Sequence, residues 1–319
     1  MLNICLRCIL IIIFVQVFID PSFPQEPKEY INNAFLKKLN SDQSYKELRS
    51  EIVSRFANIP AGHWGEFVKG VDEKILTEKK IVALTFDACG GKKGSGYDKE
   101  LIDFLRNERI PATLFVTGKW IDAQFNTFIN LSRDTLFEIE NHGLNHKPCS
   151  NKRESAYGIH GTANMGEAFD EIEANALKIK AITNHRPRFY RSATAFIDES
   201  CAGMAARLGI TPVSYQVLSG DAVPFTPDSV IEKNVLKNIT PGAIVIMHFN
   251  HPEWNTKEAL EKIVPKLRQM GYTFVLLKDF ELTSDNRKGR VEGKTGIKAK
   301  KKDHQLRSVD KRERTQTIS

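Results

Sequence analysis

The sequence is poor in the residues that define specialised scaffolds. Its 319 residues include only five cysteines, 13 prolines and 20 glycines, and it contains no internal repeat. Collagen-like, low-complexity and disulfide-dense proteins are therefore excluded. Because 41% of the residues are hydrophobic and 27% are charged, the chain must bury a core. Its length allows one large α/β domain or two small ones.

The cysteines are too few for a disulfide framework. Two of them lie in an apolar segment at the N-terminus, and the other three are Cys89, Cys149 and Cys201. Three thiols cannot all pair within one chain, so we expect at most one disulfide and one free thiol.

The chain also lacks an excess of basic over acidic residues outside its C-terminal end. The net charge is +7, and residues 284–319 alone carry twelve Lys and Arg against five Asp and Glu, which leaves the first 283 residues formally neutral. This end has almost no large apolar residues, so we predict a disordered basic tail. Such a tail can hold the protein near an anionic envelope surface, or it is a solvated tail with no dedicated partner. We expect no nucleic-acid partner, because nucleic-acid binding contradicts the export predicted from the N-terminus.

The one long apolar run lies near the N-terminus, over residues 4–19, where only Arg7 and Gln16 are polar. It is slightly short for a bilayer span, which needs about 20 apolar residues. We predict that residues 1–25 are a signal peptide or an uncleaved N-terminal anchor. The protein is then exported, and it is periplasmic, membrane-anchored or extracellular.

The middle of the chain alternates short β-branched runs with amphipathic stretches. Seven strands separated mostly by helices predict a parallel sheet of an α/β fold, open or closed into a barrel. Residues 26–78 are expected to be a helical extension that packs outside the sheet, and residues 79–283 to form the main domain. The expected strands are 81–86, 112–117, 136–139, 189–191, 210–217, 243–247 and 272–277, and the expected helices are 98–108, 166–181, 199–207, 228–238 and 257–270.

Five polar residues stand where predicted strands end, and ligands of parallel α/β folds gather at that edge of the sheet. They are Asp87, His142, Arg191, Asp221 and His248. This number exceeds what chance placement suggests, so we expect their side chains to converge on a shared pocket.

Several of these residue types suit a hydrolytic site. His142 and His146 have the i, i+4 spacing that places two imidazoles on one side of a helical turn, as metal ligation requires. The alternative is a pair of ordinary loop histidines. Asp87 suits a general base or a metal ligand, although a lone aspartate there can simply cap a turn. His248 is suited to proton transfer near neutral pH, the more so if Asp221 orients it.

The glycine-rich stretch after Asp87 carries less information. Residues 90–96 lack the Gly-Lys-Ser/Thr ending of a phosphate-binding loop, so nucleotide binding is not expected. Cys89 is a soft metal ligand, a reactive thiol or a small buried hydrophobic residue, and the last is the default.

Taken in order, these residues resemble a known family. Thr85-Phe86-Asp87, His142-x-x-x-His146, Arg191, Asp221 and Ile246-Met247-His248 are similar to the motifs of polysaccharide deacetylases of the NodB-homology type (carbohydrate esterase family 4). The resemblance spans about residues 80–282.

The resemblance implies a distorted (β/α) barrel with mostly parallel strands and a metal-dependent removal of acetyl groups from polysaccharides. Residue by residue, it implies that Asp87 is the catalytic base and that His248 is the general acid. It implies that His142 and His146 are metal ligands and that Arg191 orients the base. Asp221 matches an aspartate of the fourth motif.

The sequence departs from the family pattern at three places. Ala88 stands where the family has a second aspartate that ligates the metal, so the third protein ligand of the divalent metal, expected to be zinc, is open. Asp87, Cys89 or another side chain replaces it, or the metal is weakly held or absent. Residues 192–194 replace a Pro-rich stretch, and Leu218 replaces a further aspartate. These departures indicate a divergent subgroup.

The expected function is hydrolytic deacetylation of an N-acetylated polysaccharide in the cell envelope, such as peptidoglycan. Two alternatives remain: a non-catalytic glycan-binding barrel, and a hydrolase of the same fold acting on another carbon–nitrogen amide. Which polysaccharide is used and the oligomeric state stay open.

Overall fold

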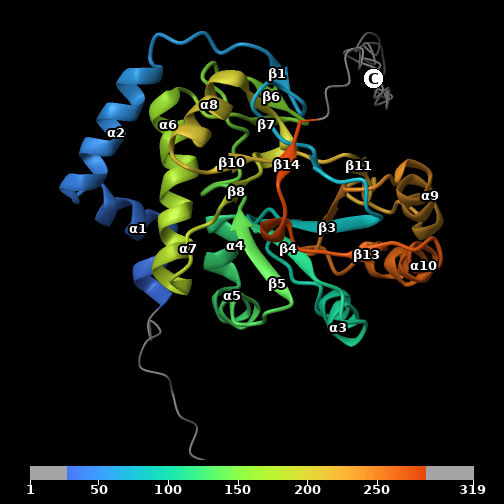
Figure 1. Ribbon diagram of the computed structural model, residues 1–319. Helices are drawn as coiled ribbons and strands as arrows, with labels where there is room; N and C mark the ends of the chain where they lie inside the picture. The colour runs from blue at the N-terminus through green and yellow to red at the C-terminus, as the bar shows by residue number, and fades with distance from the viewer. Residues whose placement is uncertain (1–26, 285–319) are drawn as a thin grey trace, which may run out of the picture. The chain divides into compact units, whose positions relative to one another are not determined.

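The central strand of the molecule is β3 (Ile81–Ala88), and every one of its eight residues is buried. The computed structural model describes residues 27–284, so the predicted signal or anchor segment and the predicted basic tail lie outside the described residues. Around β3 the described chain forms a curled, mostly parallel sheet with helices packed against it (Figure 1). The predicted fold class, a distorted (β/α) barrel, is confirmed.

Parallel pairing brings the ends of the central strands to one edge of the sheet. β3 pairs in parallel with β4 (Ala112–Val116) on one side and with β12 (Ala243–His248) on the other. Within the described chain, only β2 (Lys74–Ile75) and β14 (Leu282–Thr283) join the main sheet in antiparallel pairs. The remaining members of this sheet are β5 (Phe137–Asn141), β8 (Phe189–Tyr190), β10 (Thr211–Pro212), β11 (Val217–Leu218) and β13 (Thr273–Phe274).

Two small antiparallel pairs lie apart from the main sheet in the described chain. One joins β1 (Trp64–Gly65) to β9 (Ile197–Asp198), and the other joins β6 (Ser155–Ala156) to β7 (Ile159–His160).

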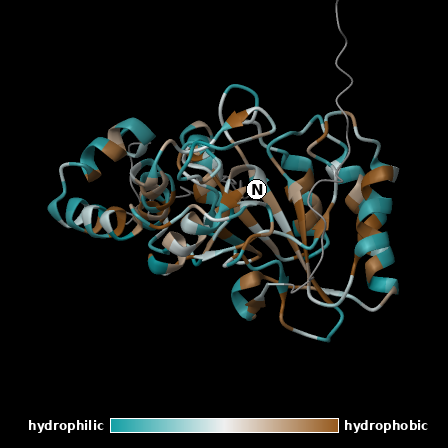
Figure 2. Cartoon of the chain, turned by 90° about the horizontal axis from the view of Figure 1, so that it is seen from above, coloured by the Kyte–Doolittle hydropathy of each residue, from teal (hydrophilic) through white to brown (hydrophobic). Residues whose placement is uncertain are grey.

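The strand sequence of β3 explains why it sits at the centre, because apolar side chains cover both of its faces. Val82, Leu84 and Phe86 belong to the cluster shared with the covering helices, whereas Ile81 and Ala83 belong to a second cluster on the opposite face. Figure 2 shows hydrophobic strands covered by helices that carry hydrophilic residues on their outer sides. The alternation fixes which residues of β3 can face the inside of the barrel.

The helices cover the sheet between successive strands. The first of them after β3, α3 (Lys99–Asn107), begins where the Asp98 side chain accepts a hydrogen bond from the backbone N–H of Leu101, at 2.9 Å. The others are α4 (Gly118–Ala123), α5 (Phe125–Ser132), α6 (Met165–Phe169), α7 (Asn175–Thr183), α8 (Glu199–Arg207), α9 (Asp228–Asn238) and α10 (Thr256–Gln269). A π-helical turn, Asp170–Ala174, joins α6 to α7.

The segment expected to be a helical extension is helical only in its first half. It forms the 3₁₀ turn Pro27–Tyr30, α1 (Asn32–Leu39) and α2 (Gln43–Phe56), which lies against α6 (Figure 1). From residue 57 to residue 78 the expectation of a helix outside the sheet is wrong, because β1 and β2 form there and β2 enters the main sheet. Two-residue strands are too short to leave a period-2 pattern in the sequence.

Two expected strands are also much shorter than predicted. Residues 210–217 give the separate strands β10 and β11, and residues 272–277 give only β13. Thr211 and Val213 donate backbone hydrogen bonds to the β8 segment, whereas Pro212 between them carries no N–H to offer the other side. Among residues 27–284, no helix combines the length and hydropathy needed to cross a membrane.

Candidate active site

The carboxylate of Asp87 stands at the end of β3 and is held by Arg191, which follows β8. Nη1 of Arg191 donates to Oδ1 of Asp87 at 2.7 Å, and both side chains are almost completely buried. Nη2 of the same guanidinium donates to the carbonyl of Ser214 at 2.9 Å, and its Cζ lies 4.2 Å from the ring centroid of Phe115. The buried ion pair therefore fixes the direction of the carboxylate.

His248 lies directly across from Asp87, because the parallel pairing of β12 with β3 places these two residues in register. Asp221 holds this histidine twice: its Oδ2 accepts from the His248 backbone N–H at 2.7 Å, and its Oδ1 lies 3.1 Å from Nδ1. Ser219 and Thr256 donate hydroxyl hydrogen bonds to the same carboxylate. With Nδ1 bound to a carboxylate, Nε2 is the nitrogen left for chemistry.

His142 follows β5 and is 1% exposed. Its Nδ1 lies 2.8 Å from the carbonyl oxygen of Arg191, and because that oxygen only accepts, Nδ1 carries the proton. Nε2 then has a free lone pair, 3.7 Å from Oδ2 of Asp87. A histidine whose second nitrogen donates to a backbone carbonyl is typical of metal ligation.

His146 lies on a loop rather than on the helical turn expected from its spacing to His142. Its backbone is left-handed, with φ of 58°, yet the two imidazoles remain neighbours with ring centroids 5.1 Å apart. Nε2 of His146 is buried and has no hydrogen-bond partner among the described residues. A buried nitrogen without a partner is costly unless something coordinates it, which fits a metal ligand.

Glu171, on the π-helical turn, supports the His146 loop. Its Oε1 accepts backbone hydrogen bonds from Asn145 and from Lys147, each at 2.9 Å, so the residues on both sides of His146 are held by one buried carboxyl group. Gly143 permits this approach: its φ is +89°, and a Cβ there would lie 2.5 Å from Oε1. Burial raises the pKa of Glu171 against the opposing effect of these backbone donors.

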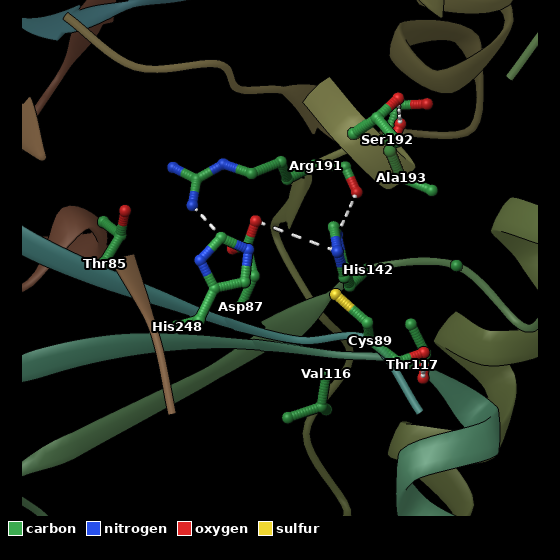
Figure 3. Close-up of polar contacts among 12 residues, drawn as sticks. Thr85, Asp87, Cys89, Val116, Thr117, His142, Arg191, Ser192, Ala193 and His248 are labelled. Carbon is green, nitrogen blue, oxygen red and sulfur yellow. Dashed lines mark hydrogen bonds and ion pairs between the residues drawn. The ribbon is translucent and has the colours of Figure 1, made fainter. Parts of the chain in front are cut away.

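Cys89 joins the two histidines, although sequence reasoning ranked it as a small hydrophobic residue. The ligating atoms of Cys89, His142 and His146 all lie within 4.8 Å of one another, and they form the one group of this kind found within residues 27–284. Figure 3 shows the Cys89 sulfur directed toward His142. Ala88, by contrast, is fully buried among the apolar residues under the helices and offers no ligand atom.

The charges of this pocket shift its proton affinities. Burial acts to raise the pKa of the Cys89 thiol, but the charge of His146 and hydrogen bonding to the surrounding histidines outweigh it and hold the pKa well below its ordinary value. Burial acts to lower the pKa of His248, and the carboxylate of Asp221 outweighs it, so this pKa lies well above its ordinary value. The pocket therefore favours a thiolate beside a protonated imidazole.

The structure thus brings together residues that stand far apart in the sequence. Asp87 and His248 lie at the ends of β3 and β12, and His142 and Arg191 directly follow β5 and β8 (Figure 3). Asp221 acts on the site through its contact with His248. Sequence reasoning missed Glu171, because an acidic residue inside a helical stretch carries no signal of its own.

The structure also describes the other departures from the family pattern. Ser192 accepts a hydrogen bond from the backbone N–H of Cys149 at 2.8 Å, and Thr194 is left-handed with φ of 62°. Leu218 is 46% exposed at the end of β11. No disulfide joins the three cysteines of the described chain.

Comparison with known families agrees with the motifs. The polysaccharide deacetylase family model matches residues 74–213. Among curated proteins, the peptidoglycan-N-acetylmuramic acid deacetylase PdaA of Bacillus subtilis is 26% identical over 271 residues, which cover 82% of this chain and 89% of that protein. A peptidoglycan-N-acetylglucosamine deacetylase of Bacillus cereus is 27% identical over 213 residues, covering 66% and 71% respectively.

Solved structures share the fold. The chain matches Bacillus subtilis PdaA, a family 4 carbohydrate esterase, with a TM-score of 0.53 at 22% identity over 72% of this chain and 87% of the other. It also matches a CE4 family pseudoenzyme from Bacillus anthracis, with a TM-score of 0.53 at 24% identity over 63% and 65%. The resemblance to polysaccharide deacetylases of the NodB-homology type is confirmed.

Proposed function

We propose that this chain, a polysaccharide deacetylase of the NodB-homology type by family and fold, hydrolyses acetyl groups from an N-acetylated glycan of the cell envelope such as peptidoglycan. The observation that carries the proposal is the pairing of an arginine-held carboxylate, Asp87, with a carboxylate-held imidazole, His248, in register on adjacent strands. Hydrolysis of an amide requires a general base and a general acid held close to each other, as these two side chains are.

A divalent metal fits beside this pair. His142 and His146 would hold it, because His142 has a free lone pair on Nε2 and His146 has a buried Nε2 without a partner in the described chain. When bound, the metal supplies Lewis-acid polarisation of the acetyl carbonyl and lowers the pKa of water. Zinc is the metal we propose, since imidazole suits it well.

The protein's own groups perform the proton transfers. Asp87 takes a proton from the attacking water, while Arg191 keeps the carboxylate aimed at that water through the 2.7 Å ion pair. His248 then gives its Nε2 proton to the leaving sugar nitrogen, because Asp221 occupies Nδ1 and favours the imidazolium form.

Acetate release from purified N-acetylated peptidoglycan tests the proposal. We expect that His142→Ala and His248→Ala each abolish acetate release, whereas His185→Ala, an exposed histidine in the loop after α7, leaves it unchanged. Undiminished release by both site variants would contradict this mechanism.

The organisation and location of the chain are part of the proposal. We propose that residues 1–25 direct export and that residues 284–319 hold the protein near anionic envelope polymers, with the catalytic domain between residues 79 and 283 and an extension before it. The relatives that act on peptidoglycan support a site of action outside the cytoplasm. Envelope fractionation of the full chain, and of a chain ending at residue 283, tests both segments.

A second candidate is a glycan-binding barrel without catalysis, and Ala88 is the observation that favours it. Ala88 removes a carboxylate ligand from this chain, and one structure that it resembles is described as a CE4 family pseudoenzyme. Both observations support a chain that keeps the barrel without catalysis. Metal analysis of protein purified without chelator separates the two. Stoichiometric metal together with acetate release supports the deacetylase, whereas the absence of both metal and acetate release supports the binding barrel. The remaining alternative, a hydrolase of the same fold that acts on another amide, is tested by measuring amine release from a panel of other amides.

A further inference from the structure

We infer that the Cys89 thiolate is the third protein ligand of the metal site and replaces the carboxylate that Ala88 lacks. This inference rests on the proposed function, because it completes the site that His142 and His146 begin. It makes the centre a Cys-His₂ site in place of one with an oxygen ligand.

The argument begins with the periodicity of β3. Successive side chains of a strand point to opposite faces, so residues at i and i+2 share a face. Asp87 points into the pocket, and Ala88 points into the cluster under the helices. Cys89 follows on the Asp87 side, and its backbone carbonyl is fixed there by the Thr117 hydroxyl, which donates to it at 2.9 Å.

Both histidines present the correct atoms to this thiol. Nδ1 of His142 is occupied by the Arg191 carbonyl, which directs the Nε2 lone pair into the space shared with the sulfur. His146 brings a buried Nε2 that has no hydrogen-bond partner in the described residues. The mutual separation of at most 4.8 Å among the ligating atoms is consistent with three ligands around one ion.

The chemistry of this donor set determines which metal it selects. A thiolate is a soft ligand and favours zinc over magnesium, calcium or manganese, which prefer oxygen donors. Three protein ligands leave a fourth position open, as in catalytic zinc sites.

X-ray absorption at the zinc edge tests the inference directly, because it measures the distances from zinc to its sulfur and nitrogen ligands. We expect one zinc–sulfur distance of about 2.3 Å together with nitrogen ligands at about 2.0–2.1 Å. The sulfur contribution should disappear in Cys89→Ser and persist in Cys201→Ala, a matched control at a cysteine buried outside the pocket. Cys89→Ser should also weaken zinc binding by more than the roughly 10- to 100-fold that is typical of losing an outer-shell partner.

A second measurement uses the unaltered full chain. Cys89 is half-buried while Cys149 and Cys201 are buried, so iodoacetamide should alkylate Cys89 faster than the other two in metal-free protein. Adding zinc should slow alkylation of Cys89 at least tenfold, as followed by peptide mass mapping, and should not change that of Cys201.

The outcomes separate this inference from the proposed function. A zinc shell of nitrogen and oxygen alone, or alkylation of Cys89 unaffected by zinc, in a protein that still releases acetate overturns the thiolate ligand and leaves the deacetylase standing. A zinc–sulfur shell in a protein that releases no acetate supports the ligand and contradicts the deacetylase.

Discussion

Replacing Glu171 by alanine should weaken metal binding without touching a ligand. The variant removes the carboxyl oxygen that accepts the backbone hydrogen bonds of Asn145 and Lys147, each at 2.9 Å. These two donors flank His146, whose left-handed backbone they help to hold. Without the acceptor, the loop is free to move into water, and metal binding must then restore its closed form.

The size of the effect follows from those two hydrogen bonds. A buried donor left without a partner costs about 1–3 kcal/mol, so two cost about 2–6 kcal/mol if the loop stays closed. In the metal-free state the loop can open, so that water satisfies the two donors and part of this cost disappears. Metal binding requires the closed loop, so the same cost then lowers the affinity for the metal. Taking the lower limit of about 2 kcal/mol, and a tenfold change for each 1.4 kcal/mol, we expect the zinc Kd to rise about 30-fold.

Competition for zinc with a chromophoric chelator measures this Kd. Glu173→Ala is the matched control, because Glu173 lies two residues away on the same turn and is similarly buried, but pairs with Arg186 instead of the His146 loop. A Kd for Glu171→Ala within threefold of the Glu173→Ala value would refute the reasoning, since the loop would then hold its form without the carboxyl group.

Three further predictions concern charge. Asp221→Asn should lower kcat about 10- to 150-fold in steady-state acetate release, because it removes a charge-assisted hydrogen bond worth about 1.5–3 kcal/mol from His248. Glu140→Gln should weaken the pH dependence of stability, because burial, and then a neighbouring carboxylate, raise the pKa of Glu140 well above 4.5. The folded state therefore retains a proton that the unfolded state loses, and stability to urea should fall less steeply in the variant than in the parent as pH rises from about 4.5. Lys178→Met should cost about 1.5–3 kcal/mol in urea unfolding, because it removes the charge-assisted hydrogen bond from the buried ammonium to the partly exposed Asp122.

The sequence was sufficient to predict the parts of the site that lie at strand ends. Asp87 and His248 each close a long apolar run, and parallel strands bring such ends to the same edge, so their meeting follows from pattern alone. His142 and Arg191 follow strands in the same way. Their shared hydrogen bond, from imidazole to backbone carbonyl, could not be predicted, since it depends on a contact between residues 49 positions apart.

The parts that sequence reasoning missed depend on backbone geometry without a periodic signal. A small buried hydrophobic residue is the default interpretation of a free cysteine such as Cys89, and its position in space follows only from β3, which runs two residues past the expected end at Phe86, to Ala88. The i, i+4 spacing of His142 and His146 predicts a helical turn, yet the segment is a loop in which His146 itself is left-handed. Two-residue strands such as β2 escape prediction because two residues cannot display a period.

The opposite orientation of Ala88 leads to a last prediction, about which strand position can supply the ligand. Ala88 is fully buried among apolar residues under the helices, so an aspartate placed there alone would bury a carboxylate without a partner instead of offering it to the histidines. The double variant Ala88→Asp with Cys89→Ser should therefore bind zinc no better than Cys89→Ser alone, and its free energy of unfolding should be lower by about 3 kcal/mol or more. Cys89→Asp, with Ala88 unchanged, places the carboxylate on the Asp87 side of the strand and should bind zinc through oxygen. Isothermal titration of both variants with zinc checks the expected failure of the aspartate at position 88 and the expected binding by the aspartate at position 89. Recovery of zinc binding by the aspartate at position 88 would show that β3 can rotate its end toward the histidines, and that the identity of the ligand is not tied to the strand face.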